Sequence, residues 1–248
     1  MTRGRLRGTA IAAIVVSTAG AAAAQPLPRI VVSVGGFAQP TDRRLEERFG
    51  FDEYLERAAV RVDHEIRGGG GFDGSVVVRV WRGLAAGVGV SHVGRRIPAA
   101  VAGEIPHPFH FSQPRAIEGR QEGIPHEETA VHAVAAWLAP VGRRMTIAIA
   151  GGPSRFSIAH GFVRGVRYSE SYPFDRATFV GADVARVRGA AAGFHAGVDV
   201  VWRLHRRAGV GGLVRYSRAA ATLQAAPGRT ARVEAGGLQA GGGLRLFF

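Results

Sequence analysis

The chain ends in "GGLQAGGGLRLFF" (236–248), a stretch whose character alternates with a period of two. Apolar or small residues occupy every even position from Leu238 to Phe248, whereas Gln239 and Arg245 occupy the opposite phase. Successive side chains of a β-strand point to opposite faces, so this stretch predicts a strand with one apolar and one polar face. The phase of Phe247 places it on the polar side.

The same period recurs along the chain, with glycine and β-branched residues mixed in. In "AVRVDHEIRGGGGFDGSVVVRVWR" (59–82) the apolar residues hold the even phase and the charged residues hold the odd phase. Only His64 intrudes on the apolar phase. An ordinary soluble sheet does not require so long a strand. Including this segment, the strands expected before the terminal one are 29–39, 59–82, 84–96, 127–140, 144–168, 193–204 and 209–223.

The connections between these segments alternate in length. Those after the second, fourth and sixth segments are tight turns, whereas those after the others are longer, namely 41–58, 97–126, 169–176 and 225–230. An even number of strands with this alternation is typical of a transmembrane barrel with both termini on the periplasmic side. We therefore predict an all-β fold, an eight-stranded antiparallel transmembrane up-and-down β-barrel over residues 25–248.

A soluble β-sandwich or a lipocalin-like periplasmic barrel would also alternate. In such folds the apolar phase packs a core and large aromatics should dominate it. Here that phase is mostly Val, Ala, Leu and Gly, with Trp137 and Trp202 beside the short turns. Aromatic residues at that height are typical of a membrane-interface girdle, which favours the membrane barrel.

The first residues predict export. Arg3, Arg5 and Arg7 precede an apolar stretch and then small residues up to Gln25, which is the pattern of a cleaved signal peptide over residues 1–24. The formal net charge of +13 would fall to +10 on cleavage, because the segment carries three arginines and no acid. The chain has no cysteine and no lysine, so its 32 basic residues are all arginine.

Together, the signal-like segment and the terminal stretch resemble those of the small eight-stranded outer-membrane barrels of Gram-negative-type bacteria, the OmpA, OmpX and OmpW sort. The resemblance covers residues 26–248 and is one of architecture, which does not fix a function. It implies that an assembly signal, read by the barrel-assembly machinery, lies on one phase of the last strand at Leu238, Leu244, Leu246 and Phe248.

If the apolar phases face lipid, the polar phases converge inside a barrel that is only wide enough for side chains to fill it. Buried charges need partners, so arginines and carboxylates there predict a paired polar network, with glycines such as Gly211 leaving room for arginine side chains. The alternative is a narrow pore for small solutes. The candidates for this inner network are Arg61, Asp63, Glu65, Arg67, Asp73, Arg79, His132, Asp199, Arg203, Arg215 and Arg245.

Catalysis is a third hypothesis, since some barrels of this class modify the acyl chains of lipopolysaccharide. The stretch 97–132 holds hydroxyl, imidazole and carboxylate groups at His107, His110, Ser112, His126, Glu127, Glu128 and His132. Their spacing matches no metal motif, because "HEETAVH" has Ala130 where HExxH needs its second histidine. We therefore expect no enzyme, no cofactor and no metal site.

The arginines are spread over strands and turns and do not cluster with stacking aromatics, which disfavours nucleic acid as a partner. We expect one set to face anionic lipopolysaccharide and another to face the inner leaflet or peptidoglycan. The first set is Arg95, Arg96, Arg164, Arg167, Arg186, Arg188 and Arg218, and the second is Arg82, Arg143, Arg144, Arg206 and Arg207. The function that the sequence favours is a non-enzymatic outer-membrane barrel, structural or surface-interacting, with a filled polar lumen.

Overall fold

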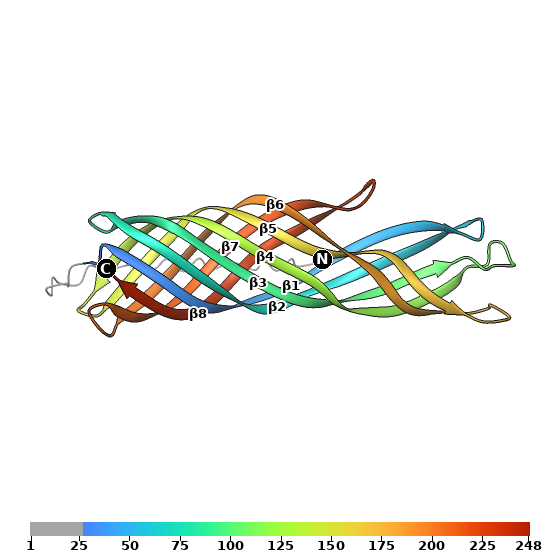
Figure 1. Ribbon diagram of the computed structural model, residues 1–248, viewed down its shortest axis with the longest axis horizontal. Helices are drawn as coiled ribbons and strands as arrows, with labels where there is room; N and C mark the ends of the chain where they lie inside the picture. Colours follow the sequence, from blue (N-terminus) through green and yellow to red (C-terminus); the bar gives the residue numbers. More distant parts are fainter. Residues whose placement is uncertain (1–26) are drawn as a thin grey trace, which may run out of the picture.

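The computed structural model describes residues 27–248, which form eight antiparallel strands in a closed up-and-down barrel (Figure 1). Each strand pairs with the next, and β1 pairs with β8 to close the ring. The predicted signal peptide lies outside the described residues. Within them, no helix is long and apolar enough to cross a membrane. The strands are β1 (Ile30–Glu53), β2 (Glu56–Trp81), β3 (Leu84–Ile105), β4 (Arg115–Val141), β5 (Met145–Glu170), β6 (Ala177–Arg203), β7 (Ala208–Ala226) and β8 (Arg229–Phe247).

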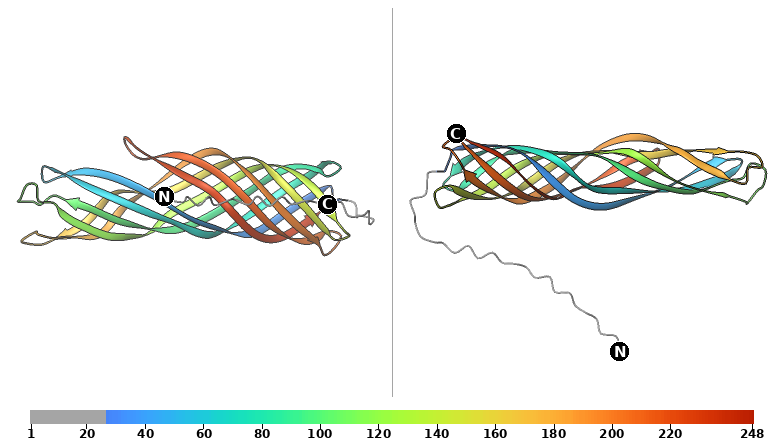
Figure 2. Two further views of the ribbon diagram at one scale, coloured as in Figure 1. Left: turned by 180° about the vertical axis from the view of Figure 1, so that it is seen from behind. Right: turned by 90° about the horizontal axis from the view of Figure 1, so that it is seen from below.

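The barrel is elongated, and its two ends differ (Figure 2). The start of β1 and Phe248 lie together at one end, where the amide of Phe248 donates to the carbonyl of Ile30 at 3.0 Å. We call the half at this end the lower barrel, comprising residues 30–39, 69–93, 129–156, 190–219 and 237–248. The other half is the upper barrel, comprising residues 42–67, 94–128, 157–189 and 220–236. The β7–β8 hairpin stops part-way along the upper barrel because its strands have 19 residues each, against 22 to 27 in the other six.

The outer surface of the lower barrel is apolar. Valine, leucine and isoleucine side chains of all eight strands point outward there, among them Val34, Val76, Val88, Val131, Ile149, Val198, Val214 and Leu244. Trp81, Trp137 and Trp202 are exposed beside the turns of the lower end, and Phe72, Phe194 and Tyr216 are exposed at the opposite edge of the band. The apolar band is therefore bordered by aromatic residues on both sides.

The upper barrel has the reverse arrangement. Its interior holds an apolar core of three clusters, which include Val62, Ile97, Ile117, Ile158, Phe162 and Leu223. Its outer surface carries charged side chains, with ion pairs between Arg61 and Asp63 at 3.0 Å and between Arg67 and Glu65 at 2.7 Å. Inside and outside thus exchange character along one continuous barrel.

Three of the predicted long loops are wrong, since the connection expected at 225–230 is only the two-residue turn 227–228. Residues 41–58 and 97–126 are mostly strand, and the connections that remain in them are 54–55 and 106–114. The periodicity persists there, but the apolar phase now points inward and consists of separated residues such as Leu45, Phe49 and Ile117, while the outward phase is charged. Dense charge in 41–58 and five prolines in 97–126 are what made these two stretches resemble loops.

Arginine side chains close the places where the strand ladders separate. The pairing of β1 with β8 ends at Ala38 and Ala240, and that of β6 with β7 ends at Gly193 and Ala219. Above the first seam, Arg43 donates to the carbonyls of Glu234 and Gly236 at 2.9 and 2.8 Å. Arg164 and Arg229 link β5 to the β7–β8 hairpin, through the carbonyls of Ala225 and Val163 respectively. The guanidinium groups thereby donate hydrogen bonds to strand carbonyls that have no partner in a neighbouring strand.

Candidate functional site

A layer of polar side chains crosses the inside of the lower barrel. Arg245 on β8 donates two hydrogen bonds to the carboxylate of Asp199 on β6, both at 2.9 Å. Such a fork geometry is the strong form of an arginine–carboxylate pair. Gly211 of β7 lies beside this pair, and a Cβ there would come within 2.9 Å of the Arg245 side chain. Glycine therefore leaves room for the pair, which any larger residue at position 211 would displace.

A second arm of this layer is built around Arg215, which is buried on β7. Its guanidinium donates to Gln239 at 2.8 Å and lies 3.9 Å from the carboxylate of Asp73. Gln239 in turn donates to Gln39, which donates to the carbonyl of Gly236, both at 2.9 Å. This arm thus spans the junction between β1 and β8, from Arg215 on β7 to Asp73 on β2.

A chain of hydroxyl and imidazole groups completes the layer. Ser91 contacts His132 at 2.9 Å, His132 contacts Ser154 at 2.8 Å, and Ser154 contacts His195 at 3.0 Å. All four side chains are buried. A serine hydroxyl can both donate and accept, so it can join two neutral imidazoles without a charge. No carboxylate hydrogen-bonds to these imidazoles among the described residues, so nothing orients the chain as a catalytic triad would require.

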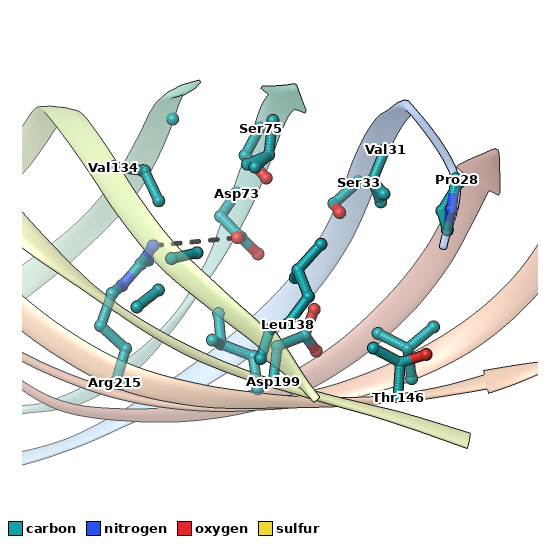
Figure 3. A pocket seen from close by; sticks show the side chains of 18 of the residues that line it. Pro28, Val31, Ser33, Asp73, Ser75, Val134, Leu138, Thr146, Asp199 and Arg215 are labelled. Atoms are coloured by element: carbon teal, nitrogen blue, oxygen red, sulfur yellow. Dashed lines mark ion pairs between the residues drawn. The ribbon is translucent and has the colours of Figure 1, made fainter. Parts of the chain in front are cut away.

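A cavity of about 120 Å³ lies between this layer and the lower end (Figure 3). Asp73, Arg215 and Asp199 face it from the polar layer, and Pro28, Val31 and Leu138 line its lower part. Phe247 is buried at the lower end, where the guanidinium of Arg203 stacks 4.9 Å above its ring. The apolar core of the upper barrel begins on the far side of the layer, so the cavity does not continue into the upper barrel.

The structure places seven of the predicted inner residues on the inner face of the lower barrel. They are Asp73, Arg79, His132, Asp199, Arg203, Arg215 and Arg245. Leu238, Leu244, Leu246 and Phe248, which carry the expected assembly signal, are all exposed on the outer face of the last strand.

The inner-face prediction is wrong for Arg61, Asp63, Glu65 and Arg67. These residues point outward on the upper barrel, where they pair with one another and with Glu46 and Arg120. The reason is the run Gly68–Gly71, within which the inward phase of β2 changes from even to odd positions. The β2–β3 pairing is interrupted there, and Arg95 donates into the gap to the carbonyl of Arg67 at 2.6 Å. Arg95 was expected at the outer rim, but its side chain is buried.

The residues considered for catalysis do not gather in one place. His132 belongs to the polar layer, Glu127 is paired outside with Arg186, and Ser112 lies in the 106–114 loop, where its amide donates to Glu56. His107 in the same loop accepts hydrogen bonds from the amides of Phe109 and His110. The set therefore offers no nucleophile beside a base.

His126 and Glu128 instead belong to a buried cluster that the sequence did not reveal. It joins Glu47, His64, His126, Glu128 and His160, from β1, β2, β4 and β5, inside the upper barrel. Burial, and then the neighbouring His64 and His126, lower the pKa of His160 to about 2, so its imidazole is neutral at physiological pH. The only sequence signal was His64, the single polar residue in the apolar phase of its strand.

The far end of the upper barrel is held together by Arg115. It donates to Glu170 at 2.5 Å, to the carbonyl of Phe174 at 3.0 Å and to the carbonyl of Pro106 at 2.7 Å. Tyr54 donates to the same carboxylate at 2.6 Å, and this hydrogen bond is the main reason why the pKa of Tyr54 is raised. The three hairpin tips are thus tied to one another and close the upper end.

No family model and no curated protein sequence matches the chain. Among solved structures it is similar to the outer membrane protein OprG from Pseudomonas aeruginosa, with a TM-score of 0.49 and 10% identity over 90% of this chain and 96% of that one. The outer membrane protease OmpT from Escherichia coli gives 0.43 and 8%, over 88% and 97%. Ail, the attachment invasion locus protein of Yersinia pestis, gives 0.34 and 11%, over 89% and 99%. The fold assignment rests on the strand pairing of the chain itself.

Proposed function

We propose that the chain is a closed, non-enzymatic outer-membrane barrel whose lower barrel spans the bilayer and whose upper barrel projects from the cell surface as a solid stem. The observation that carries this proposal is the reversal of polarity along the barrel. An apolar exterior over a polar interior suits lipid, and a charged exterior over an apolar core suits water.

The height of the apolar band supports this division. Trp81 and Phe72 border it on β2 and are about nine residues apart, which at about 3.4 Å per residue and a tilt of about 40° gives roughly 23 Å. Trp202 and Phe194 on β6 are about eight residues apart, which gives roughly 21 Å. The hydrocarbon band of outer-membrane barrels is about 25 Å tall. A strand such as β6, with 27 residues, therefore extends beyond the apolar band over more than half of its length.

The orientation follows from export through the predicted signal peptide. A chain that reaches the outer membrane from the periplasm and begins at the lower end keeps that end, with its turns of two to four residues, on the periplasmic side. The upper barrel then faces the outside. Its hairpin tips present exposed apolar side chains at Leu55, Phe109, Phe111 and Tyr172, which suits a surface-interacting role.

A solute channel is not supported by the packing. The polar layer crosses the lower lumen, and above it Phe156, Ile158 and Phe162 belong to a buried core cluster. An enzymatic role is not supported either, because the hydroxyl, imidazole and carboxylate groups within the described residues form no catalytic arrangement. A closed, non-enzymatic barrel accounts both for the packed lumen and for the lack of a catalytic arrangement among the described residues.

Fractionation and conductance test this function. We expect the protein to sediment with outer membranes, to migrate differently on gels before and after boiling, and to give no steady conductance steps in planar lipid bilayers. Heat-dependent migration reports a folded barrel, and conductance reports an open lumen. Steady openings of the purified protein would replace the closed barrel with a channel, and absence from the membrane fraction would contradict the membrane barrel altogether.

Arginines just above the apolar band suit anionic lipopolysaccharide as a partner. Arg155 and Arg188 are exposed there, and neither has a carboxylate within 4.0 Å among the described residues. Each free arginine near an anionic membrane surface contributes about 1 kcal/mol. The barrel-assembly machinery is the partner proposed for the outward phase of β8.

The arginine proposal predicts a measurable loss of binding. We expect Arg155→Gln with Arg188→Gln to weaken the binding of lipopolysaccharide by about 10- to 30-fold, because two charges of about 1 kcal/mol each are removed. The measurement is titration of detergent-solubilised protein with lipopolysaccharide. Arg44→Gln with Arg57→Gln removes the same charge from exposed positions higher on the upper barrel and should change binding little. Equal losses in both pairs would contradict a site above the band.

A further inference from the structure

Three side chains from opposite walls of the upper barrel meet in its interior. Glu47 lies on β1, His64 on its neighbour β2, and His160 on β5, which is four strands away from β1 around the ring. One ligand atom from each lies within 4.8 Å of the other two. All three side chains are buried, and the two histidines are completely so. The cluster therefore spans the barrel interior and is sealed from solvent.

For a neutral His126, the hydrogen bonds around His160 place the proton of His160 on Nδ1. Glu128 accepts from the amide of Gly236 at 2.7 Å and from Nε2 of His126 at 2.9 Å. A neutral His126 that donates through Nε2 must accept at Nδ1, and the group 3.0 Å away is Nδ1 of His160. His160 therefore donates through Nδ1, and its Nε2 holds a lone pair. That Nε2 is buried and has no hydrogen-bond partner.

The same reasoning applies to the other two residues. Nε2 of His64 lies 2.5 Å from Oε1 of Glu47, so it donates there, and Nδ1 of His64 is left with a lone pair. Nδ1 of His64 and Oε2 of Glu47 are also buried without a hydrogen-bond partner. The nearest cation is Arg229, whose Nη2 is 3.7 Å from Oε2 and donates to the carbonyl of Val163.

The three clustered side chains thus hold buried acceptors without a hydrogen-bond donor. An unsatisfied buried polar group costs about 1–3 kcal/mol, so such a set needs a cation or an ordered solvent molecule. Two imidazole nitrogens and a carboxylate oxygen are a ligand set of zinc sites. The His160–His126–Glu128 chain is also the kind of outer hydrogen-bonding support that orients a metal-ligating histidine.

We propose that Glu47, His64 and His160 bind one divalent transition-metal ion of the Zn²⁺ type. The ion cross-links β5 to β1 and β2 through the barrel interior and stabilises the upper barrel. Because the site is sealed, its role is structural, and the ion enters while the barrel folds. The donor set also accepts Co²⁺, which provides a spectroscopic probe.

Zinc content after refolding tests the site. Protein without a histidine tag is refolded in detergent with Zn²⁺, freed of loose metal by gel filtration against a chelator, and analysed by mass spectrometry of the elements. We expect about one zinc per chain to be retained in the wild type and less than about one-tenth as much in His64→Ala and His160→Ala. The matched control is His132→Ala, which removes an equally buried histidine from the polar layer and should retain the wild-type content.

Two further measurements separate loss of metal from loss of fold. Gel migration before and after boiling shows whether each variant is folded, and Co²⁺ loaded into the wild type should give the visible absorption of a four-coordinate nitrogen and oxygen site. Zinc during refolding should also raise the thermal unfolding midpoint of the wild type but not that of His160→Gln. A wild type that retains no zinc, or a folded His64→Ala, His160→Ala double variant that retains as much, would overturn the proposal.

Discussion

Val198→Arg should lower the free energy of unfolding in lipid by about 2–4 kcal/mol, whereas Val184→Arg should change it by less than about 0.5 kcal/mol. Both valines point outward on β6, and their exposed fractions are almost equal, at 39% and 37%. They differ in height. Val198 lies midway between Trp202 and Phe194 in the apolar band, and Val184 lies on the charged surface of the upper barrel. Exposure alone would predict equal costs, so only the bilayer distinguishes them.

Urea unfolding in lipid vesicles, followed by gel migration, measures both variants. A second pair on β7 repeats the test, since Val214 pairs with Val198 in the band and Thr222 lies outward above it. Val214→Arg should be costly and Thr222→Arg should not. Equally small costs within each pair would mean that no bilayer surrounds the band, and equally large costs would mean that the membrane covers the upper barrel as well.

Strand number and the terminal strand can be predicted from the sequence because period-two alternation is a local property. In the lower barrel the predicted faces are also right. There the apolar residues of 194–204 and 238–248 face outward, as a membrane barrel requires. The polar phase must then fill a narrow lumen, which is why the sequence predicts that Asp199, Arg215 and Arg245 lie there together. In the folded barrel Arg245 hydrogen-bonds to Asp199, and Arg215 lies 3.9 Å from Asp73.

The upper barrel could not be predicted in the same way. Alternation shows that the two faces of a strand differ, but it does not show which face meets water. In the lower barrel the apolar face points outward, and in the upper barrel it points inward. On β2 the reversal occurs within Gly68–Gly71, where the inward phase changes parity, so extending the lower pattern placed Arg61 and Arg67 inside. Elsewhere, as on β3, the parity is kept, and the inward residues change from Gly89 and Ser91 to Val93 and Ile97.

The buried histidine cluster had no local signature. Its members come from four strands and span residues 47 to 160, so no motif spacing joins them. Their proximity depends on the closure of the ring, which brings β5 opposite β1. A histidine in an apolar phase, such as His64, was a sign of burial with a partner, but the partner could be identified only from the folded barrel.

Ile158→Asp should destabilise the protein by at least about 4 kcal/mol, whereas Ser157→Asp should cost less than about 1 kcal/mol. The two residues are neighbours on β5, just above the apolar band, but Ile158 is completely buried in an apolar core cluster and Ser157 is exposed. A carboxylate at position 158 would meet Phe162, Leu223 and Val233 and find no hydrogen-bond donor among these cluster residues. The same carboxylate at position 157 would remain in water.

Urea unfolding and limited proteolysis in vesicles give the measurement. Because the lower barrel keeps its polar layer and its bilayer, we expect protease to trim the upper barrel of Ile158→Asp while the lower barrel stays protected. Ser157→Asp should resist protease like the wild type. If Ile158→Asp were tolerated within about 1 kcal/mol, the carboxylate would have to be hydrated, and the upper barrel would have to hold water at this level. That result would mean that the lumen above the polar layer is open to water, and it would remove the main argument against a channel.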